Sequence, residues 1–258
     1  MDIKVIVAAH KSYGMPKDDM YLPLHVGKEG KADIGFVGDN TGDNISVKNP
    51  FYCELTGLYW AWKNLDAEYI GLVHYRRHFA LRKAAKDKRL ECVLSKAEAE
   101  VRLSGCDILL PKKRNYYIEN LYDHYKNTLY VEPLDITGEI IREKFPEYCT
   151  EFERLKTRTS AHMFNMMIMK KDKLNEYCEW LFDILATLEE RVDNSQYDAF
   201  HARFYGRVSE LLLDVWLNTK GYSYTEVPLC DIEGVNWLKK GTAFLLSKFS
   251  KKKYDKSF

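Results

Sequence analysis

Short apolar runs rich in β-branched residues alternate along this chain with longer amphipathic segments, and this alternation restricts the possible folds more than any other feature. Residues 3–9, 69–73 and 107–110 are predicted to be buried strands, because each run is apolar and ends in polar or turn-forming residues. Strands that alternate with helices are typical of an α/β fold. We therefore expect one α/β domain over residues 1–236, with a mixed sheet.

Further strands and helices complete the predicted pattern. The helix over residues 205–219 has the clearest signal, because Val208, Leu211, Leu212 and Val215 fall at the i, i+3, i+4 and i+7 spacing of one helix face. The other predicted elements are strands at 32–37, 162–169 and 223–227 and helices at 50–64 and 172–190.

Two regions depart from this alternation. Residues 112–155 are rich in Tyr, Asp, Glu and Lys and are predicted to form a helical insertion. Residues 237–258 form a basic tail in which lysines interleave with Phe and Leu. This composition is typical of a segment that lies on an anionic membrane surface, and a solvated tail is the alternative.

Charge and cysteine usage exclude several classes of protein. A net charge of +1 provides no overall field that would hold a nucleic acid, so no nucleic-acid partner is expected. The six cysteines are scattered without a CxxC pair, which excludes the usual zinc spacings. The first residues read as a strand rather than a signal peptide, and no stretch reaches the length of a membrane span. We expect a cytoplasmic protein with reduced thiols.

Polar residues that directly follow strands are the first candidates for a binding site, since open α/β sheets bind ligands beyond the carboxyl ends of their strands. His10 and Lys11 follow the first predicted strand, and Asp39 and Asn40 lie in the Gly-rich loop after the second. That loop lacks the EF-hand and P-loop patterns. It predicts either a contact to a donor nucleoside or a plain turn.

Two histidines and two arginines directly after the third predicted strand form the most unusual segment. If the segment stays extended, His74, Arg76 and His78 share one face. Tyr75 and Arg77 then lie on the other face. Arginine offers a planar fork for phosphate, and fixed cations stabilise a departing diphosphate. The segment therefore predicts a donor-diphosphate site, and a surface loop with acid-paired arginines is the alternative.

Three further residues are candidates for contact with a transferred sugar. Glu210 lies off the apolar stripe of its helix and is the best candidate for a general base, although an i,i+3 ion pair with Arg207 on an exposed helix face is the preferred explanation from the sequence alone. Asn165 is a polar amide among methionines and needs a partner, for which a sugar hydroxyl is one option. His162 is predicted to bind the donor or to be a hydrogen-bonded core histidine.

The order of several blocks resembles a bacterial family of capsular-polysaccharide glycosyltransferases, formerly a domain of unknown function. The resemblance covers residues 3–227 and implies a GT-A-like fold. It further implies sugar transfer in capsule, O-antigen or related glycan synthesis, with galactofuranosyl transfer from UDP-galactofuranose among the activities. The blocks are AAHK, GDN, ELTGLYWAWKN, YIGLVHYRRHF, HMFNMMIMKK and RVSE.

The resemblance also implies roles for individual residues. His74, Tyr75, Arg76 and Arg77 are expected at the donor diphosphate, and Asn165 and Glu210 near the transferred sugar. Most GT-A enzymes hold Mg²⁺ or Mn²⁺ with an Asp-x-Asp motif, which this sequence lacks. We expect the arginines to replace the cation, with Mn²⁺ or Mg²⁺ as the alternative cofactor.

The sequence thus predicts a glycosyltransferase that uses a UDP-sugar such as UDP-galactofuranose or UDP-galactose. The expected acceptor is an oligosaccharide or a lipid-linked glycan at the inner face of the plasma membrane. A non-catalytic module that binds a nucleotide or a glycan is the alternative, and turnover of a sugar nucleotide separates the two.

Overall fold

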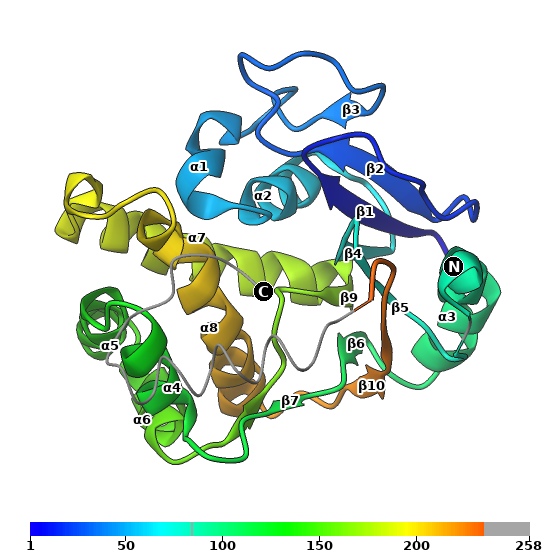
Figure 1. Cartoon of the computed structure of the whole chain (residues 1–258). Coiled ribbons are helices and arrows are strands. Elements are labelled where there is room, and N and C mark those ends of the chain that lie inside the picture. The colour runs from blue at the N-terminus through cyan, green and yellow to red at the C-terminus, as the bar shows by residue number, and fades with distance from the viewer. Residues whose placement is uncertain (84, 235–258) are drawn as a thin grey trace.

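The computed structural model describes residues 1–83 and 85–234, within which a nine-stranded mixed sheet forms the centre of the molecule (Figure 1). The main path of the sheet runs β10-β6-β9-β4-β1-β2-β3, and β5 joins β4 to β11. The strands of the sheet are β1 (Ile3–Ala9), β2 (Tyr21–His25), β3 (Val37–Gly38), β4 (Tyr69–His74), β5 (Arg77–Phe79), β6 (Ile108–Pro111), β9 (Met167–Lys170), β10 (Thr225–Val227) and β11 (Leu229–Asp231), and a separate pair is formed by β7 (Arg114–Asn115) and β8 (Ser160–Ala161).

The strand directions bring several chain segments to one edge of the sheet. β1 pairs in parallel with β2 and β4, whereas β9 runs antiparallel between β4 and β6. The carboxyl ends of β1, β2, β4 and β6 and the amino end of β9 therefore lie at the same edge, which we call the carboxyl edge. Ligands of open α/β sheets bind at such an edge.

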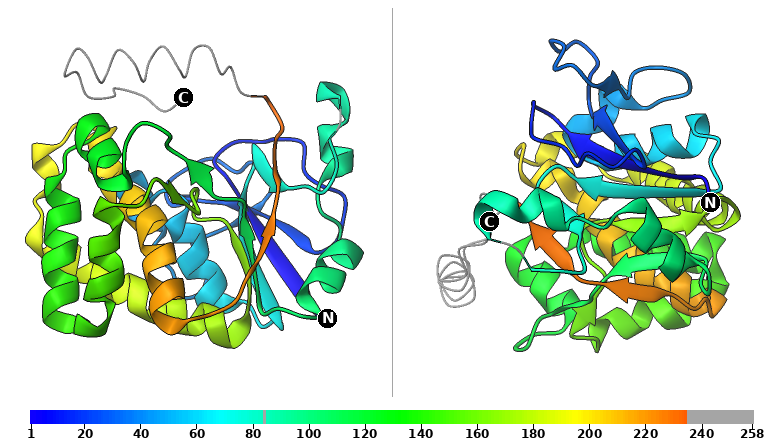
Figure 2. Two further views of the ribbon diagram at one scale, coloured as in Figure 1. Left: turned by 90° about the horizontal axis from the view of Figure 1, so that it is seen from below. Right: turned by 90° about the vertical axis from the view of Figure 1, so that its right-hand side faces the viewer.

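Helices cover both faces of the sheet (Figure 2). Side chains of α2, α7 and α8 pack on one face, and α3 packs on the other, while α4, α5 and α6 form a group beyond α8 (Figure 1). The helices are α1 (Asn49–Tyr52), α2 (Leu55–Asn64), α3 (Lys96–Leu103), α4 (Leu121–Thr128), α5 (Glu132–Lys144), α6 (Cys149–Glu153), α7 (Lys171–Arg191) and α8 (Phe204–Lys220).

Strand β1 shows why helices must pack on both faces of the sheet. Ile6 and Ala8 belong to the core that contains α2, α7 and α8, whereas Val5 and Val7 belong to the core that contains α3. Successive side chains of a strand point to opposite faces, so an apolar run without polar alternation buries residues on both. Full burial of one such side chain contributes about 1.5–3 kcal/mol to stability.

The structure confirms the mixed α/β sheet and most of the predicted elements. The run at residues 3–9 is β1, and the runs at 69–73 and 107–110 are β4 and β6. The helices predicted at 172–190 and 205–219 are α7 and α8. The region predicted as a helical insertion contains α4, α5 and α6.

The second strand was predicted in the wrong place. Residues 32–37 are mostly exposed loop, and Gly35 has a φ of 81° that no strand residue adopts. The true second strand, β2, contains Pro23, which lacks a backbone donor and obscures the strand pattern. The proline is tolerated because β3 pairs only with Leu24 and His25.

Two other predictions fail where the chain turns near the carboxyl edge. Residues 162–166 do not continue the strand of β9, because Phe164 and Asn165 have φ values of 77° and 51°. Residues 74–78 are not one extended segment either. His74 pairs with Arg77 across a tight turn, and His78 is buried on β5.

The predicted helix at 50–64 is divided into α1 and α2 at Cys53, whose φ is 54°. Within residues 1–83 and 85–234, no helix combines the length and the apolar character needed to cross a membrane. The basic tail at 237–258 lies outside the described residues.

Candidate active site

The loop after β1 and the turn between β4 and β5 meet in a cluster of aromatic and cationic side chains. The rings of His10 and Tyr13 lie 5.1 and 4.2 Å from the ring of Tyr75, measured between centroids. Lys11 Nζ lies 4.9 Å from the Tyr13 ring centroid, and the Arg76 guanidinium lies 5.2 Å from that of Tyr75. Burial and the nearby Lys11 and Arg76 lower the pKa of His10, which is therefore neutral at pH 7. His10, Lys11, Tyr75 and Arg76, four of the predicted donor-site residues, therefore lie in one cluster.

Both arginines of the turn, which we call the turn arginines, have acidic partners. Arg76 Nη1 lies 3.4 Å from Glu233 Oε2, and Arg77 Nε lies 3.5 Å from Asp231 Oδ2. The first pair is about half exposed, at 40 and 46%, whereas the second is mostly buried, at 18 and 20%. The Arg77 guanidinium also lies 4.5 Å from the Phe164 ring centroid. A diphosphate would have to replace at least the exposed acid.

His74 is held by the strained segment before β9. Its Nε2 lies 2.6 Å from the backbone oxygen of Phe164, and because a carbonyl only accepts, Nε2 carries the proton and donates it. Burial lowers the pKa of His74, so the ring is neutral at pH 7. His74 therefore fixes the Phe164 turn at the site, and its Nε2 is not available to a donor phosphate.

Glu54 is anchored by a buried hydrogen-bond network that the sequence did not predict. Asn165 Nδ2 donates to Glu54 Oε1 at 2.7 Å and to the Gly206 oxygen at 2.9 Å, and Asn165 Oδ1 accepts from Ser209 Oγ at 2.9 Å. Both amide hydrogens of Asn165 are thus committed to protein partners. The proposed sugar-hydroxyl contact of Asn165 is not needed to satisfy it, and the residue instead orients Glu54.

Strained backbone surrounds the same carboxylate. Among the residues that the structure describes, the non-glycine residues with positive φ are Cys53, Phe164 and Asn165. Cys53 directly precedes Glu54, and Asn165 bonds to it. Such conformations cost about 1–3 kcal/mol each and are concentrated at functional sites.

Glu210 lies on α8 in a setting suited to acid–base chemistry. Burial and, to a smaller extent, the negative charge of Glu54 raise the pKa of Glu210 to about 7, against the opposing effect of Arg114, Arg77 and Arg207. A carboxyl group with this pKa is half ionised at neutral pH. It can therefore accept a proton and release it again near pH 7.

Three arginines around Glu210 have neutral partners; we call them the lobe arginines. The Arg207 guanidinium lies 3.9 Å from the Phe200 ring centroid, and that of Arg114 lies 4.9 Å from the Tyr116 ring centroid. Arg203 Nε donates to Cys53 Sγ at 2.9 Å, and burial raises the pKa of this thiol to about 11, so the thiol is uncharged. Within residues 1–83 and 85–234, none of these arginines forms an ion pair with a carboxylate.

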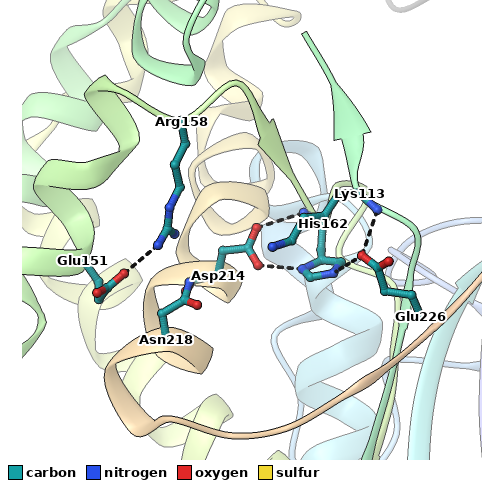
Figure 3. Close-up of polar contacts among 7 residues, drawn as sticks. All are labelled: Lys113, Glu151, Arg158, His162, Asp214, Asn218 and Glu226. Atoms are coloured by element: carbon teal, nitrogen blue, oxygen red, sulfur yellow. Dashed lines mark hydrogen bonds and ion pairs between the residues drawn. The ribbon is translucent and has the colours of Figure 1, made fainter.

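His162 does not belong to the donor site (Figure 3). It is fully buried, its Nδ1 lies 2.6 Å from Asp214 Oδ1, and its Nε2 lies 3.0 Å from Glu226 Oε1. Both ring nitrogens therefore contact carboxylates of the protein. His162 therefore has the contacts expected of a hydrogen-bonded core histidine, the alternative to donor binding, and it joins α8 to β10.

Asp39 is also occupied by the protein. Its Oδ2 accepts from the Gly27 amide at 2.8 Å and from Thr56 Oγ1 at 2.6 Å, and its Oδ1 accepts from the Lys28 amide and Ser46 Oγ. Four bonds use all the acceptor positions of a carboxylate. Asp39 is fully buried and fixes the loop rather than binding a nucleoside, and its neighbour Asn40 donates to Glu29 Oε2 at 3.1 Å.

Glu54, Arg114 and Arg203 were not predicted as site residues. These residues lie on α1–α2, β7 and the start of α8, and no local pattern distinguishes them from surface charges. In the part of the chain that the structure describes, no three His, Cys, Asp or Glu side chains gather as metal ligands.

Comparison with known proteins places the chain beside a glycosyltransferase. The apo structure of WbbM, a bifunctional glycosyltransferase, matches with a TM-score of 0.84 and 31% identity. The match covers 91% of this chain and 46% of WbbM, so the chain spans about half the length of that protein. The fold is thus GT-A-like, as the resemblance implied. No curated protein matches the chain.

Residues 4–221 match one protein family, described as a domain of unknown function. The match includes nearly all of β1 and the whole of β4, β9 and α8, and with them the turn arginines, Glu54 and Glu210. Because it extends over most of the chain, the protein belongs to the DUF4422 family.

Proposed function

We propose that this protein is a glycosyltransferase that moves a sugar from a nucleoside diphosphate to a hydroxyl group of a glycan. The observation that carries the proposal is Glu210, a carboxyl group with a pKa of about 7 among arginines at the carboxyl edge of a GT-A-like sheet. A general base works best when its pKa is near the operating pH. The similarity to a bifunctional glycosyltransferase supports the same reaction class.

The proposed reaction is a single displacement at the anomeric carbon of the donor sugar. The acceptor oxygen attacks this carbon while its proton passes to Glu210, and the bond from the carbon to the diphosphate oxygen breaks. The nucleoside diphosphate leaves with both electrons of that bond. Arg76 and Arg77 stabilise the negative charge that develops on it, as fixed cations do most effectively in a site that excludes water.

The finer assignments depend on the family resemblance of the sequence. It favours UDP-galactofuranose or UDP-galactose as the donor and a lipid-linked oligosaccharide of capsule or O-antigen synthesis as the acceptor. The enzyme would then work at the inner face of the plasma membrane, with residues 237–258 near the lipid surface. The arginines supply positive charge at the diphosphate, and Mn²⁺ or Mg²⁺ carried by the donor is the alternative.

Release of UDP from a panel of UDP-sugars tests the proposal, with and without an oligosaccharide acceptor and with and without EDTA. We expect one sugar to give acceptor-dependent UDP release. Isothermal titration measures the binding of UDP in parallel with this assay. UDP binding without turnover of any sugar would instead identify a non-catalytic binding module, and loss of turnover in EDTA would establish the metal-dependent alternative.

A further inference from the structure

The lobe arginines, Arg114, Arg203 and Arg207, carry positive charge that no acid of the described chain neutralises by an ion pair. Burial lowers the pKa of Arg207, and the positive charge of Arg203 lowers it further. Glu210 is close enough to raise the pKa of both Arg203 and Arg207, but among the described residues no carboxylate forms an ion pair with either guanidinium. Their arrangement therefore indicates a ligand that brings negative charge.

The neutral partners of these arginines leave their donor groups available. Phe200 and Tyr116 contact two of the guanidinium groups through ring faces, and Cys53 accepts only from Nε of Arg203. Aromatic packing fixes the plane of a guanidinium without using its N–H groups. The arginines are thus oriented in advance for the forked hydrogen bonds that phosphate oxygens accept.

A buried hydroxyl group supports the same site independently. Tyr125 on α4 is 5% exposed, and its Oη has no hydrogen-bond partner among the described residues. Burial raises the pKa of Tyr125, and Arg207 and Glu210 are among the charges that act on it. An unpaired buried hydroxyl is unfavourable, and a ligand oxygen would give it a hydrogen-bond partner.

We propose that Arg114, Arg203 and Arg207 form a second anion subsite, which binds a phosphate or diphosphate group of the acceptor. This inference rests on the proposed function, in which the turn arginines bind the diphosphate of the donor and Glu210 faces the acceptor hydroxyl. Arg114 lies on β7, Arg207 on α8 and Arg203 in the short turn directly before α8, so the new subsite is built from other elements than the turn arginines of the β4–β5 segment.

The subsite also restricts the length of the acceptor. Arg207 lies three residues before Glu210 on α8, on the same helix face, so a phosphate that it binds and a hydroxyl that Glu210 deprotonates are separated by few sugar units. The enzyme would therefore add its sugar near the phosphate-bearing end of a short acceptor. Acceptors of many units, in which the phosphate is distant, would lose this contact.

Isothermal titration of the full chain with two probes tests the subsite. Decyl diphosphate represents the acceptor phosphate and UDP represents the donor. We expect Arg207→Gln and Arg203→Gln each to weaken decyl diphosphate binding at least tenfold and to change UDP binding less than twofold. Arg76→Gln should show the reverse. Arg142→Gln, which removes an exposed arginine of α5, should change neither.

Two results would overturn the subsite. If Arg207→Gln and Arg203→Gln weaken UDP as strongly as decyl diphosphate, these arginines serve the donor. If folded variants with unchanged melting temperature bind both probes as the native protein does, no second anion subsite exists. A native protein that binds decyl diphosphate through Arg207 but does not bind UDP would support the subsite while the proposed UDP-dependent function fails.

Discussion

The two groups of arginines differ in how their charge is balanced. Arg76 and Arg77 lie beside Glu233 and Asp231, so the unliganded protein already neutralises them. The lobe arginines pack against aromatic rings and a thiol and keep their charge. A ligand must compete with an ion-paired acid at the first group, whereas at the second no carboxylate of the described residues forms an ion pair that it would have to displace. The turn arginines therefore suit an anion that displaces an acidic partner. The lobe arginines suit an anion that binds without displacing one.

Glu210 connects the two groups, because arginines from both act on its pKa. The largest expected effect follows from removing its charge. Glu210→Gln should lower the turnover of a UDP-sugar by about 10³-fold, within the range of general-base removal. The native enzyme should lose kcat/KM as the pH falls below about 7, because the raised pKa of Glu210 means that protonation removes the base there.

The control for this variant is Glu139→Gln, which changes an exposed glutamate of α5. Its turnover and pH profile should match those of the native enzyme. Substantial activity of Glu210→Gln with an unchanged acid limb would show that another group takes the proton, and Glu54 would be the next candidate.

A second difference exists within the turn arginines, since the Arg77–Asp231 pair is mostly buried and the Arg76–Glu233 pair is not. Arg77→Ala should lower the free energy of unfolding by about 2 kcal/mol, because it leaves Asp231 without its cation and uncovers Phe164. Arg76→Ala should cost less than about 1 kcal/mol, as exposed pairs do. Urea denaturation at pH 7 measures both. Equal losses would mean that the two pairs do not differ in strength.

The smallest expected effect follows from removing the charge of Glu233, from which Arg76 must separate to bind a diphosphate. Glu233→Gln keeps an oxygen for the Tyr13 hydroxyl, which now donates to Glu233 at 2.9 Å, but removes the charge opposite Arg76. UDP should bind up to about fivefold more tightly, the equivalent of 1 kcal/mol for an exposed pair. The matched control is Glu147→Gln, at an exposed position outside the site. Weaker UDP binding in Glu233→Gln would indicate that Glu233 itself contacts the donor.

Much of the fold was predictable because local patterns determine it. Val208, Leu211 and Leu212 identify α8 by their spacing, and the apolar run of β4 identifies a buried strand. The position of Arg76 and Arg77 just beyond that strand then follows from the strand direction. The failures occurred where single residues override a pattern, as Pro23 does in β2 and as Phe164 does before β9.

The candidate site was less predictable than the fold. Asp39 and His162 have the residue types of a ligand site, yet their partners Thr56 and Asp214 come from other segments and use all or most of their hydrogen-bonding capacity. Residue type shows what a side chain can bind. It does not show which protein groups already occupy it.

The sequence by itself determined the α/β pattern, the limits of α7 and α8, and the presence of arginines after β4, since each depends on neighbours within a few residues. Tertiary structure alone decided that Glu54 and Arg114 approach Glu210 and that only some of the arginines have acidic partners. The physical reason is that burial and charge act through space. The pKa of one carboxyl group on α8 therefore depends on side chains that are about a hundred or more residues away along the chain.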